Sequence, residues 1–95
     1  MMTTKYQITY EKSFRRQYKL LIKRGYDIAL LDDIILKLAN GEPLQSKHRD
    51  HPLHGDRLGY RDCHIKDDWV LIYKIDKGVL TLILAETGTH SDLFK

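Results

Sequence analysis

The stretch from Trp69 to Glu86, WVLIYKIDKGVLTLILAE, decides the fold. It holds two apolar runs, 69–75 and 79–86, on either side of the polar turn Asp76-Lys77-Gly78. Runs of this length, rich in β-branched and aromatic residues and separated by a glycine-containing turn, are typical of a β-hairpin. We therefore predict two adjacent antiparallel strands here. A further strand predicted at 60–65 is also antiparallel to 69–75, because only a tight turn connects the two.

The first half of the chain predicts one strand and two helices. KYQITY at 5–10 places Tyr6, Ile8 and Tyr10 on one face of a short strand. Apolar residues at helical spacing then predict a helix that begins after a Ser13 cap and ends before Gly25. A second helix is predicted to begin at Asp27 and to stop at Asn40-Gly41.

The element order β-α-α-β-β-β predicts an α+β fold. An N-terminal helical hairpin packs on a small antiparallel sheet, and a short C-terminal segment follows. The 95 residues fit one domain spanning 1–95, since most domains run from about 50 to 250 residues. Residues 42–59 form a long polar loop with both prolines, and loops of that length are often functional.

Composition narrows the functional class. The chain carries a net charge of +3 and a pI near 9.0, a mild basic bias that favours a polyanion such as nucleic acid, or an acidic protein partner. No apolar run approaches the roughly 20 residues of a membrane helix, and the N-terminal residues lack the apolar centre of a signal peptide. We expect no membrane association and a cytoplasmic location. The lone Cys63 fits that expectation, and we interpret it as a small residue packed in a strand.

The hairpin geometry brings polar side chains to one end of the sheet. The antiparallel strands place Glu86 near Asp68, with His90 leaving the sheet at the same end. His64 and Asp68 flank the turn between their strands. His51 is placed by reach alone, because Tyr60 follows it by nine positions and this length of chain allows the loop to fold back to this end.

This cluster suits acid–base cleavage of RNA. Imidazole gains and loses a proton near neutral pH, so one histidine can deprotonate a ribose 2′-OH while another protonates the departing 5′-oxygen. Arg61 is a candidate to stabilise charge on the phosphate. No metal or other cofactor is required. Two alternatives stay open: loop histidines are usually plain exposed residues, and His48, His51 and His54 with Asp50 could bind zinc, although zinc sites typically use Cys/His sets on defined turns or helices.

Four motifs, HPLHG at 51–55, GYRDCHI at 59–65, DW at 68–69 and GTHSDLF at 88–94, resemble the YafQ branch of the RelE-like bacterial toxins. The resemblance implies a toxin of a type II toxin–antitoxin pair that cuts messenger RNA in the ribosomal A site. Cleavage is then metal-independent and leaves 2′,3′-cyclic phosphate ends. Carried over by motif, the catalytic residues are His51, His64, Asp68 and His90. His51 is assigned as base and His90 as acid, while His64 and Asp68 orient groups and support the transition state.

The resemblance also implies supporting residues and partners. Phe94 resembles an aromatic residue that holds the RNA, and Arg61 matches an arginine of the motif. The expected partners are a cognate antitoxin, a ribbon-helix-helix dimer similar to DinJ, together with the ribosome, mRNA and, through the antitoxin, operator DNA. Cys63 and Asp67 depart from the family pattern without replacing a catalytic group.

Two other functions remain possible on the sequence alone. One is a non-catalytic toxin-like module that acts with its antitoxin at an operator, and the other is a metal-dependent nuclease. Trp69 could stack on a base, but it begins an apolar strand and we predict that it packs in the core.

Overall fold

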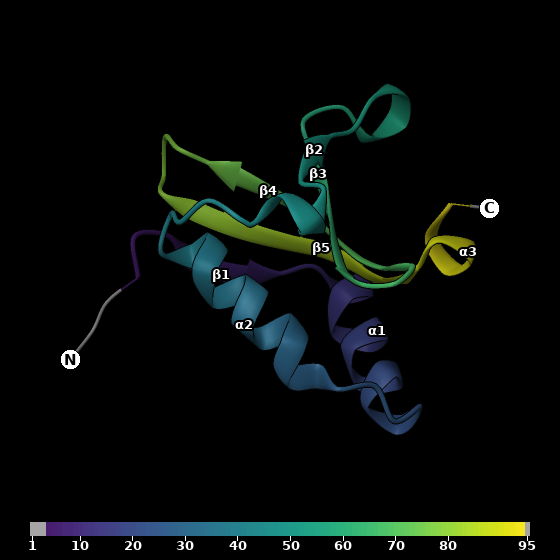
Figure 1. Ribbon diagram of the computed structural model, residues 1–95. Helices are drawn as coiled ribbons and strands as arrows, with labels where there is room; N and C mark the ends of the chain where they lie inside the picture. Colours follow the sequence, from purple (N-terminus) through teal and green to yellow (C-terminus); the bar gives the residue numbers. More distant parts are fainter. Residues whose placement is uncertain (1–3, 95) are drawn as a thin grey trace.

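Two helices cover one face of a five-stranded sheet in the computed structural model, which describes residues 4–94 (Figure 1). The α+β class and the predicted order of the main elements are confirmed. The elements are, in chain order, β1 (Gln7–Tyr10), α1 (Lys12–Lys23), α2 (Ile28–Ala39), the 3-10 turn η1 (Ser46–His48), β2 (His51–Pro52), the 3-10 turn η2 (Gly55–Arg57), β3 (Arg61–Lys66), β4 (Trp69–Asp76), β5 (Thr81–Thr89) and α3 (His90–Leu93).

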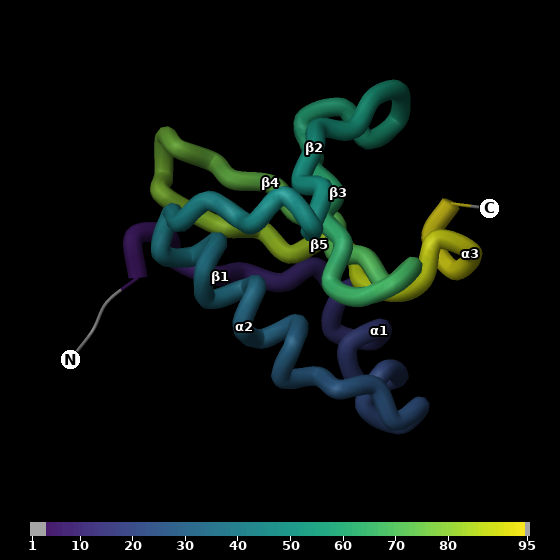
Figure 2. Tube along the Cα trace, viewed as in Figure 1, coloured from purple at the N-terminus to yellow at the C-terminus, as the bar shows by residue number. Residues whose placement is uncertain are grey.

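The sheet is mixed instead of antiparallel throughout. Its strand order is β1-β5-β4-β3-β2, and β1 pairs in parallel with β5 from Gln7 opposite Thr81 to Tyr10 opposite Leu84. Figure 2 shows the N-terminal strand running alongside β5 before the chain turns into α1. The expectation of an antiparallel sheet holds for the β2 to β5 pairings, and the helical hairpin supplies the long connection that a parallel pair needs.

The β4–β5 hairpin forms as predicted, but its register differs from the expectation. Strand β5 continues to Thr89, which lies opposite Trp69, while Glu86 lies opposite Ile72. The turn spans residues 77–80 and pairs Asp76 with Thr81, which accounts for most of the difference, and a β-bulge beside Ile72 and Tyr73 inserts one further residue, Ala85. The placement of Glu86 near Asp68 is therefore wrong. The placement of His90 at that end is confirmed, because its backbone N–H donates to the Asp68 carbonyl at 3.1 Å.

The helix boundaries follow local chemistry with one exception. Helix α1 begins after Glu11 instead of at Ser13, whose hydroxyl donates to the Ala85 carbonyl at 2.7 Å and so ties α1 to β5. Gly25 follows the end of α1 with φ of 83°, a left-handed conformation that glycine adopts without steric cost. Helix α2 begins at Ile28, one residue after the predicted start at Asp27, which is its N-cap. No helix within residues 4–94 is long and apolar enough to cross a bilayer.

Buried apolar side chains lie on both faces of the sheet. The larger cluster, between the sheet and α1 and α2, includes Phe14, Leu31, Leu71 and Leu84. The smaller cluster lies on the opposite face and consists of Val70, Ile72, Ala85 and Leu93, with Leu53 and Tyr60 packed against it. Because Leu93 belongs to α3, this smaller cluster fixes the C-terminal turn against the face of the sheet that the two long helices leave open.

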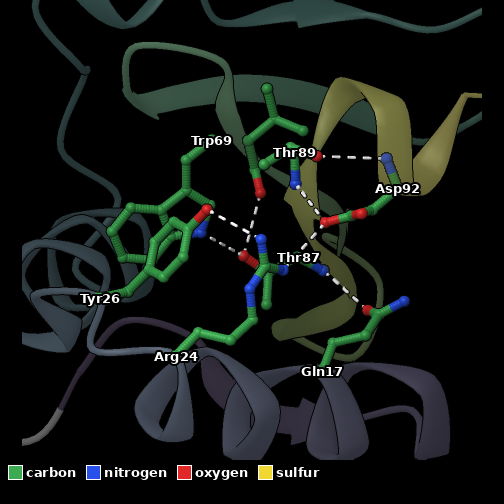
Figure 3. A network of polar contacts seen from close by, with 8 residues as sticks. Gln17, Arg24, Tyr26, Trp69, Thr87, Thr89 and Asp92 are labelled. Carbon is green, nitrogen blue, oxygen red and sulfur yellow. Dashed lines mark hydrogen bonds and ion pairs between the residues drawn. The ribbon is translucent and has the colours of Figure 1, made fainter.

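Trp69 packs in the core, as predicted. It is 3% exposed, and the Tyr26 ring meets it edge-on with the two ring centroids 5.1 Å apart. Its indole N–H donates to the Thr87 hydroxyl at 3.0 Å, and that hydroxyl donates in turn to the Val70 carbonyl at 3.0 Å (Figure 3). Both hydrogen bonds are buried, so the indole joins the ends of β4 and β5 where the catalytic candidates begin.

Replacement of Trp69 by Phe tests this packing. The phenyl ring keeps part of the apolar contact but removes the donor to Thr87 and leaves space beside Tyr26. We expect the free energy of unfolding in urea to fall by about 1–3 kcal/mol. Val79→Ala, at a position that is 68% exposed, is the control and should change stability by less than about 0.5 kcal/mol. Equal stability of the two variants would contradict the structural role of the indole.

Candidate active site

Side chains alternate between the two faces of β3. Asp62 lies opposite Ile72 and His64 lies opposite Val70, so both point to the face that carries α3. Cys63, fully buried, points to the helix-covered face and packs in the larger apolar cluster. Burial raises the pKa of the Cys63 thiol, which disfavours the thiolate and agrees with its interpretation as a packed residue.

The long loop is held against β3 by two side-chain anchors. The buried His48 places Nδ1 at 2.6 Å from the His64 carbonyl, which can only accept, so Nδ1 donates. Asp50 accepts from the Tyr73 hydroxyl at 2.6 Å and from the Arg61 Nε at 3.1 Å. These contacts fix the residue that follows, His51, and the loop pairs with β3 as the short strand β2.

His51 lies directly opposite Asp62 in the β2–β3 pairing. Directly opposed residues point to the same face of a sheet, so His51 joins Asp62 and His64 there. Its Nδ1 lies 2.6 Å from the Arg49 carbonyl and therefore carries the proton of that hydrogen bond. In the neutral ring the other nitrogen, Nε2, then has a free lone pair.

Helix α3 brings His90 and Phe94 to the same face. The His90 ring centroid lies 5.1 Å from that of His64 and 5.3 Å from that of Phe94. The two histidines are partly buried, and Phe94 is 39% exposed. A capping box forms the start of α3: the Thr89 hydroxyl accepts from the Asp92 N–H, and the Asp92 carboxylate accepts from the Thr89 N–H (Figure 3).

Asp62 is the centre of this arrangement. Its side chain is 3% exposed, its Oδ2 lies 4.0 Å from His90 Nε2, and its Oδ1 has no hydrogen-bond partner among the described residues. Burial raises the pKa of the Asp62 carboxyl, and positive charge on His51, His64, His90 and Arg57 opposes that rise. Those opposing effects show that three histidines and one arginine act electrostatically on the same carboxyl group.

Asp68 lies beside the cluster on the turn after β3. It lines an open cleft of about 490 Å³ with His64, His90, Lys47 and Lys66. Its carboxylate is exposed and makes no hydrogen bond or ion pair within the described part of the chain. His64 Nδ1 faces the Asp67 carbonyl at 3.4 Å, so this turn also orients the His64 ring. The Asp68 side chain is therefore available to a ligand in the cleft.

The structure thus brings together His51, His64, His90 and Phe94, with Asp68 beside them. It does not place Arg61 there. Arg61 lies opposite Tyr73 and pairs with Asp50 at 3.1 Å, on the face of β3 away from Asp62. The predicted contact of Arg61 with a phosphate among the histidines is not supported by this geometry. The strand alternation that separates Arg61 from Asp62 explains the difference.

Sequence reasoning missed two residues of the site, Asp62 and Arg57. The signal for Asp62 was present, because it precedes His64 by two positions and must share its face in a strand. Arg57 had no comparable signal. It lies in η2, and its guanidinium reaches the Leu93 carbonyl, Glu86 and the Phe94 ring.

The loop histidines considered as zinc ligands separate in space. His48 is buried and hydrogen-bonded to the backbone of β3, His51 lies in β2, and His54 is exposed before η2. Across residues 4–94, no group of three or more histidine, cysteine or acidic side chains is arranged to hold a metal ion.

Comparisons with known proteins identify the family. The family model described as "Bacterial toxin of type II toxin-antitoxin system, YafQ" matches residues 6–95. The chain belongs to the YafQ toxin family. The mRNA interferase toxin YafQ of Escherichia coli K12 is 40% identical over 88 residues, which cover 92% of this chain and 94% of that protein.

Solved structures of bacterial toxins share the fold. A crystal structure of the E. coli DinJ–YafQ toxin–antitoxin complex matches with a TM-score of 0.87 and 38% identity, covering 96% of this chain and 99% of that one. A metal-bound toxin from Helicobacter pylori matches with a TM-score of 0.88 and 42% identity, covering 94% and 99%. The chain is therefore a type II toxin with the YafQ fold.

The buried Asp62 carboxyl predicts a pH-dependent stability difference. Its pKa in the folded chain is raised above the ordinary 3.8, so the folded state binds this proton more tightly than the unfolded state. The contribution of Asp62 to stability is therefore present at low pH and is lost as pH rises through the folded-state pKa. Asp62→Asn removes this titration. We expect the stability of Asp62→Asn relative to the unsubstituted chain to increase as pH rises from about 3 to 7.

Urea unfolding of both proteins across that pH range measures the difference directly. Titrations of groups that do not interact with Asp62 occur in both chains and cancel to first order. A difference that is constant with pH, or that decreases as pH rises, would contradict the burial of an ionisable carboxyl group at this position.

Proposed function

We propose that this toxin is a ribosome-dependent mRNA endonuclease that cleaves by metal-independent acid–base chemistry. The observation that carries the proposal is the convergence of His51, His64 and His90 on one carboxylate, Asp62, beside an open cleft. The relatives named mRNA interferase toxins, at 40% identity over most of the chain, support endoribonuclease activity. The ribose 2′-OH is the nucleophile, and the product is a 2′,3′-cyclic phosphate.

His51 acts as the general base. Its Nδ1–H donates to the Arg49 carbonyl, which orients the ring and leaves Nε2 free to accept the 2′-OH proton. The deprotonated 2′-oxygen attacks the adjacent phosphorus and forms the new P–O bond. The residue is exposed, so an RNA strand can reach it without rearrangement of the core.

His90 acts as the general acid. Its Nε2 is the nitrogen that faces Asp62, at 4.0 Å from Oδ2, so a protonated ring is attracted to that carboxylate. As the bond from phosphorus to the 5′-oxygen breaks, His90 gives its proton to the departing oxygen. One proton is taken and one is given, so the enzyme returns to its starting state after the two histidines exchange protons with solvent.

His64 and Asp68 support this reaction from the cleft. The His64 ring lies 5.1 Å from that of His90, close enough to place a second imidazole against the same phosphate. Asp68 orients a neighbouring imidazole or the ribose once RNA fills the cleft. Lys47 and Lys66 also line the cleft and supply positive charge along the RNA backbone.

Phe94 holds the RNA beside the reacting atoms. Phe94 contacts His90 and Arg57 and is still 39% exposed, so part of its ring is accessible to a nucleotide base. Stacking of a base on an aromatic side chain contributes about 1–3 kcal/mol and tolerates any base. Phe94 therefore positions RNA with little sequence preference of its own.

The biological context follows from the family and the charge of the chain. The DinJ–YafQ complexes among the relatives support a cognate antitoxin, which we propose is a ribbon-helix-helix dimer that also connects the toxin to operator DNA. The net charge of +3 favours contact with RNA in the ribosomal A site, where the mRNA codon is exposed. Action on ribosomes implies a cytoplasmic location.

Substitution of His90 by Gln tests the proposal. Loss of the general acid should lower the rate of mRNA cleavage on programmed ribosomes by about 10²- to 10⁴-fold, the usual contribution of one proton-transfer group. His54→Gln is the matched control, because it makes the same change at an exposed loop histidine outside the cluster. Cleavage is measured under single-turnover conditions, with and without a chelator, and product ends are identified as 2′,3′-cyclic phosphate or otherwise.

Three results would contradict the proposal. Cleavage by His90→Gln at the rate of the unsubstituted toxin would remove the acid–base role. Inhibition by chelator, reversed by added metal, would indicate a metal-dependent nuclease. Tight antitoxin binding without cleavage of RNA, on or off the ribosome, would indicate a non-catalytic module.

A further inference from the structure

Helix α3, which carries His90, is too short to be stable by itself. It spans four residues, His90–Leu93, whereas isolated helices need roughly 12–15 residues to persist in water. Its first turn is fixed by the Thr89–Asp92 capping box, and Leu93 packs against the smaller apolar cluster. The exposed Arg24 adds an ion pair to Asp92 at 3.4 Å (Figure 3). The other end of the helix depends on a residue from elsewhere in the chain.

That residue is Arg57. Its Nη2 donates to the Leu93 carbonyl at 2.9 Å, across a separation of 36 residues in sequence. Carbonyl groups at the end of a helix lack partners within the helix, and a basic side chain satisfies them and interacts favourably with the helix dipole. The Arg57 guanidinium therefore closes the C-terminal end of the helix that begins with His90.

The same guanidinium contacts the RNA-binding aromatic ring. Its Cζ lies 4.7 Å from the centroid of Phe94, within the range of a cation–π interaction. Its Nη1 lies 3.0 Å from Glu86 Oε2, an ion pair that lacks the alignment of a hydrogen bond, since Nη1 is buried without a hydrogen-bond partner in the described chain. Glu86 and Phe94 thus both contact the Arg57 guanidinium.

We propose that Arg57 is a positioning residue for RNA cleavage, which holds His90 and Phe94 in a fixed relation to the histidines of β2 and β3. This inference rests on the function proposed above. Arg57 joins the loop that carries His51 to the helix that carries His90, so one side chain couples the two sides of the site. The positive charge of Arg57 also acts on Asp62, in the direction that lowers the pKa of that carboxyl.

Arginine suits this position better than lysine. The planar guanidinium presents several donors in fixed directions and also stacks on an aromatic face, so it can contact a carbonyl, a carboxylate and a ring at once. A lysine ammonium retains the charge but has no planar face, and it reaches these partners only in alternative rotamers. Arg57→Lys should therefore restore part of the function and not all of it.

Single-turnover cleavage of mRNA on programmed ribosomes tests the proposal. Misplacement of reacting groups by about 1 Å lowers rates by up to about 100-fold, so we expect Arg57→Gln to lower the maximal cleavage rate roughly 10- to 100-fold. The toxin concentration at half-maximal rate should also rise, because Phe94 loses its support. Arg57→Lys should lie between Arg57→Gln and the unsubstituted toxin. Arg24→Gln, which removes the exposed ion pair to the same short helix, should stay within twofold.

A double-mutant cycle separates positioning from general structural support. If Arg57 affects the toxin concentration at half-maximal rate through Phe94, this effect should disappear once Phe94 is removed. The double variant Arg57→Gln/Phe94→Ala should then need a concentration less than twofold above that of Phe94→Ala alone. The unfolding transition of each variant is measured in urea, and cleavage is assayed under conditions where that variant is fully folded. Folded protein is then compared with folded protein. If Arg57→Gln does not fold, the cycle is run with Arg57→Lys.

The inference and the proposed function fail in different ways. If Arg57→Gln cleaves mRNA at a rate within twofold of the unsubstituted toxin, while His90→Gln is inactive in the same assay, the inference is overturned and the proposed function stays intact. Independent, multiplicative effects of the Arg57 and Phe94 substitutions would also overturn it. Full cleavage by His90→Gln would overturn the function and with it the inference.

Discussion

The alternation of side chains along β3 is the constraint on which the site depends. Pairing of β3 with β4 turns Cys63 toward the helices and Asp62 and His64 toward the opposite face. The register of β2 then adds His51 directly opposite Asp62. A shift of one residue in either pairing would exchange the faces and separate the histidines. The buried contacts of Trp69, Tyr73 and Cys63 on the helix-covered face therefore also determine which side chains lie on the face that carries α3.

Asp62 shows how this small fold balances stability against function. A carboxyl that is 3% exposed, with one oxygen lacking a hydrogen bond within residues 4–94, lowers the stability of the folded chain. Positive charge on the surrounding histidines and Arg57 offsets part of this cost. Such a group is typical of functional sites, where local strain or desolvation is tolerated because the site requires it.

Much of the fold could be predicted from the sequence because its signals are local. The hairpin at 69–86, the two helices and their stops at Gly25 and Asn40 follow from apolar spacing and turn residues. The parallel pairing of β1 with β5 could not be predicted, because strand order depends on packing between distant segments. The turn at 77–80 pairs Asp76 with Thr81, and this register moved Glu86 away from Asp68. The β-bulge at Ala85 leaves no clear pattern in the sequence either, and it places Glu86 opposite Ile72, on the face where it meets Arg57.

The site was predicted only in part, because some of its residues are placed by local turns and others by contacts between distant segments. The positions of His64, Asp68 and His90 at one end of the sheet follow from the turns, whereas His51 depends on the Asp50 and His48 anchors of an irregular loop. Those anchors are tertiary contacts that no spacing rule reveals. The assignment of a phosphate-binding role to Arg61 neglected the alternation of side chains along a strand, which places Arg61 on the face opposite Asp62 and His64. The role of Arg57 depends on the contact between η2 and α3, which the sequence does not indicate.

The imidazole ¹⁵N spectrum of the chain, recorded with and without Asp62→Asn, tests the central claim most directly. We expect His51 to be an Nδ1–H tautomer when neutral, and we expect Asp62→Asn to change the ring signals of His51, His64 and His90 together. The signals of the exposed His54 should stay unchanged. Ring signals of the three histidines that do not respond to the loss of the Asp62 charge would contradict the claim that one carboxylate unites them.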